Sequence, residues 1–589
     1  MLIFALSLSI FVGCTKPPEL PDDDDPPALN PPAENGEDDI DTFNLIFDKE
    51  TKLEMDIDIE DTELAKLEAD YHTYAAFGSK SPIYRRCDLK IKATAKDGAV
   101  TEYLIEDVGI RMKGNTSRTS FYSDEEGMYN LIHFKLSFGE TFDEEEYYGE
   151  DAVVWESEEK REERKDRTFA TLEKMDIRWN KSADTTYIRE IYSYDLFRSE
   201  GVLAPHTNLA SVNIGEDHAG IFVINEPIDK IFLEKNLPKA VQGGDLYKLG
   251  WTSTGATFTS FTSYGKEDED KGKFYTYDIK TNKKTTTHES LRRLIEGLNS
   301  PTLTKEGLAE LVDMESFLSF AAVSFIAGNP DDLRNNYNNC YVYFRADNGK
   351  AVFIPYDLDR GLGVNIWNPY GDGMIAESPF TDRNVQGRQE SPLFLKTVVA
   401  GGFYTEEYAE RLAEVIESPM LTTAAFNARF ELAKSLYMND AAPSKVYQNA
   451  GHCRFEFDNT ASASPSEQAN MSFADYITAR IGSIRTALAE GTREPTGVYV
   501  RADFTNWNIN DAYMLEDAGD GKYTITLDLG YDFRFKIYTS NGESWYGSEC
   551  LTEENEVPFE TDDHTNIALK SGRYLVTFDS STKTITLEY

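Results

Sequence analysis

The sequence predicts an α+β protein in two parts, a large mixed body and a small antiparallel β-sandwich at the C-terminal end. Helical and extended patterns alternate irregularly over residues 42–490, whereas residues 497–589 hold only short strand-like runs separated by turns. The composition changes between them at 491–497, GTREPTG, which is typical of a linker. A chain of 589 residues is also too long for one ordinary core.

The composition narrows the classes of function. Asp and Glu number 103 against 59 Lys and Arg, for a formal charge of −44, which argues against nucleic acid as a partner because phosphate binding needs a basic face. With 40% hydrophobic residues the chain can form sizeable cores. The five cysteines show no CxxC spacing, so we expect buried free thiols.

The N-terminus has the layout of an anchored protein. Residues 2–13 form an apolar run too short to span a bilayer. It ends in Phe11-Val12-Gly13-Cys14, which resembles a bacterial lipobox, so residues 1–14 would be a signal peptide with Cys14 as the lipidated residue. Residues 15–41, rich in Pro and Asp, predict a stiff, solvated tether. We therefore expect an extracytoplasmic, membrane-anchored lipoprotein at the cell surface.

The first part of the body predicts one helix, several strands and exposed segments. The helix covers 60–74, the strands cover 87–95, 101–113, 210–214 and 220–225, and the charged stretch 139–167 and the Thr- and Ser-rich stretch 250–290 read as exposed.

Two features of this part could contact phosphate. After the strand 101–113, the turn Lys113-Gly114-Asn115-Thr116-Ser117 could bring backbone N–H groups close to phosphate, or be a structural turn only. Glu226 and Lys248 could form the Lys–Glu pair that positions phosphates in protein kinases, or a surface ion pair.

The centre of the sequence is the stretch 328–363. Residues 340–346 and 351–355 predict two strands of a hairpin around Asp347-Asn348-Gly349. The loop before the hairpin holds Asp331, Asp332 and Asn339, and the loop after it holds Asp357 and Asp359. Because a hairpin returns the chain to its starting point, we expect the two loops to lie side by side and to gather two to four carboxylates in a small volume.

The polar loops admit two explanations. Carboxylate and amide oxygens are the ligands that Mg²⁺ and Ca²⁺ prefer, and in phosphoryl transfer one Asp orients the hydroxyl while an Asn and a later Asp hold Mg²⁺. Asp and Asn also favour ordinary turns. Around these loops the apolar spacing predicts helices over 314–327, 406–417, 422–436 and 472–488, the first of them buried.

Several blocks in order resemble the CotH family of spore-coat-type atypical kinases, over roughly residues 42–490. The quoted blocks are Ile110-Arg111-Met112-Lys113-Gly114-Asn115, Gly220-Ile221-Phe222-Val223-Ile224-Asn225-Glu226, Leu246-Tyr247-Lys248, Asn329-x-Asp331-Asp332, Asn338-Asn339-x-Tyr341-x-Tyr343 and Ile354-Pro355-Tyr356-Asp357-x-Asp359. Tyr356 departs from the family, which usually has Trp there.

The resemblance implies ATP with Mg²⁺ (or Mn²⁺) as cofactors and a Ser or Thr hydroxyl of a surface or secreted protein as acceptor. It implies Asp332 or Asp331 as the base and Asn339 and Asp357 as metal ligands, with Asp359 as a secondary one. Lys248, Glu226, Lys113 and Asn115 would serve the nucleotide.

The last part resembles starch- and glycogen-binding modules. Its predicted strands are 498–504, 522–527, 532–538, 573–578 and 584–588. The resemblance places Trp507, Lys536 and Trp545 where such modules contact α-glucan; aromatic faces stack on sugars and Lys donates to hydroxyls. The alternative is that the Trp side chains pack in the core.

Two hypotheses follow for the whole chain. One is a surface-anchored kinase with a glycan-binding module. The other is a non-catalytic glycan-binding or scaffolding lipoprotein whose body binds Ca²⁺ or is structural.

Overall fold

The computed structural model describes residues 37–588, apart from internal stretches. These stretches are residues 77, 115–116, 124–127, 182–183, 253–254, 268–271, 365–377, 382–390, 451–453, 461–470, 492–496, 506–512, 540–543, 549–554 and 563–564. The predicted signal peptide and Cys14, most of the tether, Asn115 and Trp507 therefore lie outside the described residues. Among the residues described, no helix is both long and apolar enough to cross a bilayer.

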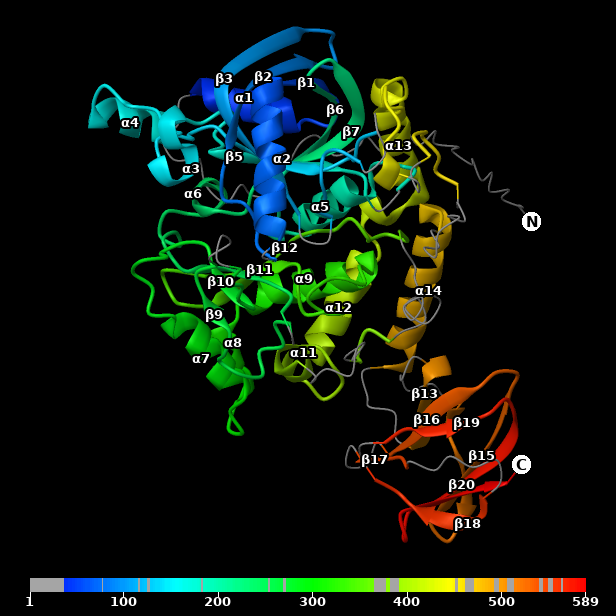
Figure 1. Ribbon diagram of the computed structural model, residues 1–589. Coiled ribbons are helices and arrows are strands. Elements are labelled where there is room, and N and C mark those ends of the chain that lie inside the picture. The colour runs from blue at the N-terminus through cyan, green and yellow to red at the C-terminus, as the bar shows by residue number, and fades with distance from the viewer. Residues whose placement is uncertain are drawn as a thin grey trace, which may run out of the picture.

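Seven strands of the N-terminal half close into a barrel in the order β1-β2-β3-β4-β5-β7-β6 (Figure 1). Neighbouring strands are antiparallel except β1 and β6, whose parallel pairing closes the ring. Alternate residues point inward; Leu53, Met55 and Ile57 of β1 are fully buried. The strands are β1 Lys52–Asp58, β2 Arg85–Thr94, β3 Val100–Lys113, β4 His133–Ser137, β5 Lys174–Trp179, β6 Thr207–Ile214 and β7 Asp217–Asn225.

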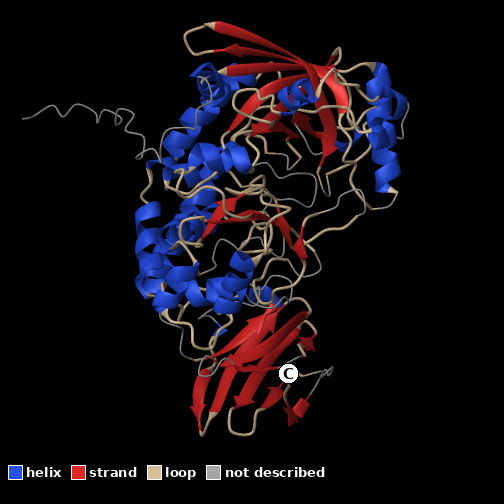
Figure 2. Cartoon of the chain, turned by 90° about the vertical axis from the view of Figure 1, so that its left-hand side faces the viewer, coloured by secondary structure: helices blue, strands red, loops and turns tan. Residues whose placement is uncertain are grey.

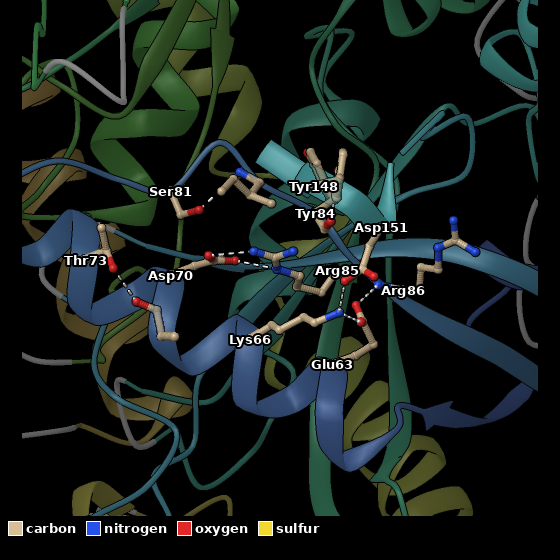
Figure 3. A network of polar contacts seen from close by, with 12 residues as sticks. Glu63, Lys66, Asp70, Thr73, Ser81, Tyr84, Arg85, Arg86, Tyr148 and Asp151 are labelled. Atoms are coloured by element: carbon tan, nitrogen blue, oxygen red, sulfur yellow. Dashed lines mark hydrogen bonds and ion pairs between the residues drawn. The ribbon is translucent and has the colours of Figure 1, made fainter. Parts of the chain in front are cut away.

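Helix α2 (Asp61–Ala75) packs against β2 and β3 and corresponds to the helix predicted over 60–74. Figure 3 shows the polar network that holds it. Arg85 of β2 donates to both carboxylate oxygens of Asp70, at 2.7 and 2.8 Å. Lys66 bridges Glu63 and Asp151 at 2.7 and 2.9 Å. The other helices of this part are α1 Glu37–Phe47, α3 Glu145–Tyr148, η1 Gly149–Asp151, α4 Glu158–Lys165 and α5 Arg189–Ser199.

A second, five-stranded sheet has the order β12-β11-β8-β10-β9. Its strands are β8 Leu246–Leu249, β9 Tyr264–Gly265, β10 Tyr277–Ile279, β11 Cys340–Phe344 and β12 Ala351–Pro355. The predicted hairpin is confirmed as β11–β12. The expectation that 250–290 is exposed throughout is wrong, because Tyr277 and Ile279 of β10 pair with β8 and are buried.

Helices gather on one side of this sheet (Figure 2). The central helix α9 (Met314–Ala327) is buried, as predicted, and ends at Gly328 in the left-handed conformation, φ 61°. A Cβ at Gly328 would lie 2.0 Å from the Tyr476 hydroxyl, so glycine is required there. The remaining helices are α6 Lys230–Asn236, α7 Glu289–Leu298, α8 Lys305–Leu311, α11 Pro392–Thr397, α12 Thr405–Val415, η2 Pro419–Leu421, α13 Thr423–Tyr437, η3 Gln448–Ala450 and α14 Phe473–Glu490.

Beyond α14 the chain forms two further antiparallel sheets that share a core including Phe535, Val576 and Phe578 (Figure 1). One sheet is β13-β16-β17 with β19 beside β16, and the other is β14-β15-β20-β21-β18. The elements are β13 Val498–Ala502, η4 Asp503–Thr505, β14 Glu516–Gly519, β15 Lys522–Leu529, β16 Phe533–Thr539, β17 Ser544–Tyr546, β18 Asn555–Glu560, β19 Ile567–Leu569, β20 Gly572–Asp579 and β21 Thr584–Glu588.

Candidate active site

The two polar loops flanking the β11–β12 hairpin lie side by side, as the hairpin predicts. The Asn329 side chain donates to the Asp357 carbonyl oxygen at 3.0 Å. The Tyr356 N–H donates to the Asn339 carbonyl oxygen at 3.2 Å. Asn339 and Asp357 both have left-handed backbones, with φ of 51° and 59°. Such conformations are uncommon outside glycine and cluster at functional sites.

The first loop holds its own carboxylates. Asp332 accepts from the backbone and side-chain nitrogens of Asn335 at 2.8 and 3.0 Å, and burial raises the pKa of Asp332 to about 7. Asp331 accepts from Asn336 and Asn338 at 2.6 and 3.2 Å. Both carboxylates of the first loop thus make their hydrogen bonds to amide groups of their own loop.

The carboxylates of the second loop converge on a residue of the barrel. Arg178 of β5 pairs with Asp357 and lies 3.9 Å from Asp359 and 2.5 Å from Glu190 of α5. Burial raises the pKa of Asp357, but the Arg178 guanidinium and nearby lysines hold it below its usual range. Burial raises the pKa of Glu190 to about 7. One guanidinium thus faces three carboxylates.

Next to this group, Lys113 at the end of β3 forms an ion pair with Asp176 of β5 at 2.5 Å. The Lys113 ammonium also donates to the Tyr356 hydroxyl at 3.0 Å. Asp176 is nearly fully buried, whereas Lys113 is partly exposed. This pair joins two barrel strands and reaches the second sheet through Tyr356.

Lys248 of β8 lies over the Tyr356 ring, with Nζ 4.7 Å from the centroid. Among the described residues it has no carboxylate within ion-pair distance. Burial and the neighbouring lysines Lys280, Lys80 and Lys113 lower its pKa. Lys113 and Lys248 therefore place two ammonium groups against one tyrosine.

The predicted pairing of Lys248 with Glu226 is wrong. Glu226 lies just after β7 and is fully buried, where its carboxylate pairs with Lys235 of α6 at 2.5 Å and with His206 at 2.9 Å. Burial raises the pKa of Glu226, but Lys235 and His206 hold it at about 2. Glu226 belongs to the barrel, on the side that faces α6, whereas Lys248 belongs to the second sheet.

The side chains of this site include groups that could bind nucleotide phosphates and a divalent cation. The Lys113 and Lys248 ammonium groups suit the phosphates of a nucleotide. For a divalent cation, Asp357 and Asp359 supply hard oxygen donors, but Asn339 uses its side-chain N–H on the Asp331 carbonyl, at 2.7 Å. Within the described ranges, no three His, Cys, Asp or Glu side chains are grouped as a metal site. The carboxylate oxygens of Asp357 and Asp359 are nevertheless the type of ligand that a hard cation prefers.

Three residues of this site, Asp176, Arg178 and Glu190, were not predicted, and neither was the role of the Tyr356 hydroxyl. For Asp176 and Arg178 the sequence did contain one signal, the alternation of charged and apolar residues in β5. In β5, KMDIRW, Asp176 and Arg178 alternate with the buried Met175 and Ile177, so two charges share the outer face of the strand. What that face meets depends on long-range packing.

In the C-terminal part, Lys536 and Trp545 share a sheet face that is not the core. Lys536 alternates along β16 with the core residues Phe535 and Ile537. Trp545 pairs across the strands with Tyr538, and the Arg501 guanidinium lies 4.2 Å from its ring centroid. Lys536 is nearly buried and Trp545 is half-buried.

A family model described as CotH kinase protein matches residues 145–439, half of the chain. The chain belongs to the CotH family. The matched range contains the acidic loops, Arg178 and Lys248 of this CotH protein, whereas Lys113 precedes it.

No curated protein matches the chain. Among solved structures, a crystal structure of SusF from Bacteroides thetaiotaomicron is similar at 22% identity, with a TM-score of 0.14. The match covers 16% of this chain and about a quarter (24%) of the SusF chain, so neither fold nor function is inferred from it.

Proposed function

We propose that this CotH protein is an atypical kinase that transfers the γ-phosphate of ATP to a Ser or Thr hydroxyl of an extracytoplasmic protein. The observation that carries the proposal is Lys248. An ammonium group without a carboxylate partner among the described residues, beside Lys113 and close enough to Asp357 to affect its pKa, is poised for an anionic ligand. ATP supplies that anion.

Each group has a role in this proposal. Lys113 and Lys248 bind phosphate oxygens, and Arg178 and Glu190 orient Asp357. Asp357, Asp359 and Asn339 would hold Mg²⁺ or Mn²⁺, which would neutralise charge on the phosphates when bound. Asp331 is the better candidate for the base, because Asp332 is the more buried of the two. Asp332 then shapes the loop.

We place this kinase outside the cytoplasm. The lipobox-like segment ending at Cys14 and the predicted tether after it, whose last residues 37–41 form the start of helix α1, support a lipid-anchored surface protein. We take 42–490 as the CotH domain and 497–589 as a β-sandwich module that binds α-glucan or another polysaccharide. The position of Lys536 and Trp545 on one outer sheet face supports the module, with Trp507 as a third contact.

A second candidate is a non-catalytic glycan-binding scaffold whose body is structural or binds Ca²⁺. The observation that favours it is Arg178, which already compensates the charge of Asp357. In this candidate the charged groups between barrel and second sheet only join the two.

Calorimetric titration of the full-length protein with ATP and Mg²⁺ or Mn²⁺ separates the candidates. We expect metal-dependent ATP binding by the wild type and its loss in Asp357→Ala, with glycan binding unchanged. Glu289→Ala, an exposed carboxylate on α7, is the control and should bind as the wild type does. If the wild type binds no nucleotide with either metal, the kinase proposal is wrong and the scaffold remains.

A further inference from the structure

Tyr356 stands where the barrel meets the second sheet, directly after β12. Its ring packs edge-on against Tyr341 of β11, with the ring centroids 5.3 Å apart. Two ammonium groups from different sheets meet it, one at the hydroxyl and one over the ring. Lys113 of the barrel donates to the hydroxyl at 3.0 Å, and Lys248 of the second sheet lies 4.7 Å from the centroid.

These two ammonium groups repel each other, and Lys113 contributes to the lowered pKa of Lys248. A carboxylate between them would remove the repulsion but would also compete with any anionic ligand. A phenol reduces the repulsion only in part, and it carries no negative charge that would compete with an anionic ligand. Its oxygen accepts a hydrogen bond from Lys113, which also keeps its ion pair with Asp176, and the negative face of the ring attracts Lys248, whose positive charge stays available.

The remaining charges around Tyr356 are already paired. Asp176 binds Lys113, and Arg178 binds Asp357 and Glu190. Tyr356 is therefore the group that fixes Lys248, and it does so relative to Lys113 on the opposite sheet. It is partly exposed, as are both lysines, so all three lie at a surface that a ligand can reach.

We propose that Tyr356 is a positioning residue that holds Lys113 and Lys248 at one spacing, so that both ammonium groups contact the phosphates of the same nucleotide. The inference rests on the proposed kinase function and deepens it. It assigns the Tyr356 hydroxyl to Lys113, whose Nζ also lies 5.6 Å from the ring centroid, and the ring face to Lys248, which has no hydrogen bond to the hydroxyl. Tyr356 itself transfers no proton and forms no bond to the ligand.

The test separates the two contacts by substitution in the full-length protein. Tyr356→Phe removes the hydroxyl and keeps the ring, whereas Tyr356→Leu removes both. Tyr343→Phe is the matched control, because it deletes a buried phenol of the same hairpin that bonds to the Val241 carbonyl instead. Calorimetry measures the affinities for ATP with Mg²⁺ and for inorganic tripolyphosphate, and thermal melting checks the fold.

We expect Tyr356→Phe to weaken both ligands about fivefold, and Tyr356→Leu about twentyfold or more. The loss should be the same for ATP and tripolyphosphate, because the contact acts on phosphate, and Tyr343→Phe should bind as the wild type does. If Tyr356→Leu fails to fold, Tyr356→Phe carries the test.

Equal affinities in the wild type and Tyr356→Phe overturn the inference and leave the kinase proposal standing. A loss for ATP without a loss for tripolyphosphate also overturns it, since the effect then lies elsewhere in the nucleotide site. A wild type that binds neither ligand overturns both the kinase proposal and this inference.

Discussion

Two groups of charged side chains join elements of this protein, and they are built differently. Beside α2, Asp70 forms an ion pair with Arg85, and Lys66 forms ion pairs with Glu63 and Asp151 (Figure 3). Between the barrel and the second sheet, the Lys248 ammonium has an aromatic ring, and no carboxylate among the residues described lies within ion-pair distance.

The difference separates charge used for stability from charge kept for a ligand. A buried ion pair with two parallel hydrogen bonds holds the helix and the strand that carry it in one geometry. Removal of one partner leaves the other charge buried and uncompensated. A partly buried ammonium without a counter-ion costs stability, and such groups are concentrated at sites that bind a ligand. The following changes, ordered by expected effect, test this distinction.

Arg85→Ala should have the largest effect. It leaves the nearly buried Asp70 carboxylate without its partner, so we expect the free energy of unfolding to fall by about 3 kcal/mol. Urea unfolding measures it, and ATP affinity should not change. Arg86→Ala is the control, since Arg86 is half-exposed and lies 3.6 Å from an exposed Asp107. Equal effects of the two substitutions would remove the distinction between buried and exposed pairs.

Glu226→Gln tests a buried pair through pH. The pKa of Glu226 in the folded state, about 2, is below the value of about 4.5 in an unfolded chain, so ionised Glu226 stabilises the fold above pH 4.5. We expect the variant to be less stable by about 2 kcal/mol at pH 7. The difference should shrink as the pH falls from 4.5 towards 2, and a constant difference would contradict the assignment. Chemical unfolding at several pH values measures it.

Lys248→Met should reverse the pattern of Arg85→Ala. Because burial lowers the Lys248 pKa, the charged side chain is not stabilised by the fold, and stability should stay the same or rise slightly. ATP affinity should fall about tenfold, the effect of one lost charged contact. Lys92→Met, in an exposed pair with Glu54, is the control for both measurements. A large loss of stability without a loss of affinity would make Lys248 structural.

Lys66→Met should have the smallest effect. The Lys66 side chain is 39% exposed and that of Asp151 71%, and pairs open to water contribute little because water already solvates both charges. We expect the melting temperature to change by less than about 2 °C. A larger drop would mean that the whole network of Figure 3 acts as one unit.

The local elements of this structure could be predicted from the sequence, and the long-range ones could not. Helix α9 and strand β12 have the predicted bounds, because buried runs and the Asp-Asn-Gly turn are local signals. The closed barrel was not predicted, since it depends on the parallel pairing of β1 with β6, whose residues Glu54 and Ser211 lie far apart in sequence.

The site divides in the same way. Asp357, Lys113 and Lys248 were predicted singly; the structure brings the two lysines to the Tyr356 ring and pairs Asp357 with Arg178. Arg178 was missed because nothing in β5 says which sheet its outer face meets. Glu226 was assigned to the wrong lysine because a sequence block gives the residue type but not the direction in which its side chain points from the barrel.

The closed barrel also limits how this chain can be shortened. The family match begins at residue 145, so strands β1–β4 lie before it in the sequence. A truncated protein limited to 145–439 would keep β5 and β6 but lose β4 and β1, the strands that pair with their outer edges. Two unpaired edges and an opened core favour aggregation. The segment that carries the family signature thus lacks two of the strands that close the barrel, and we expect the smallest soluble fragment of this part to include β1.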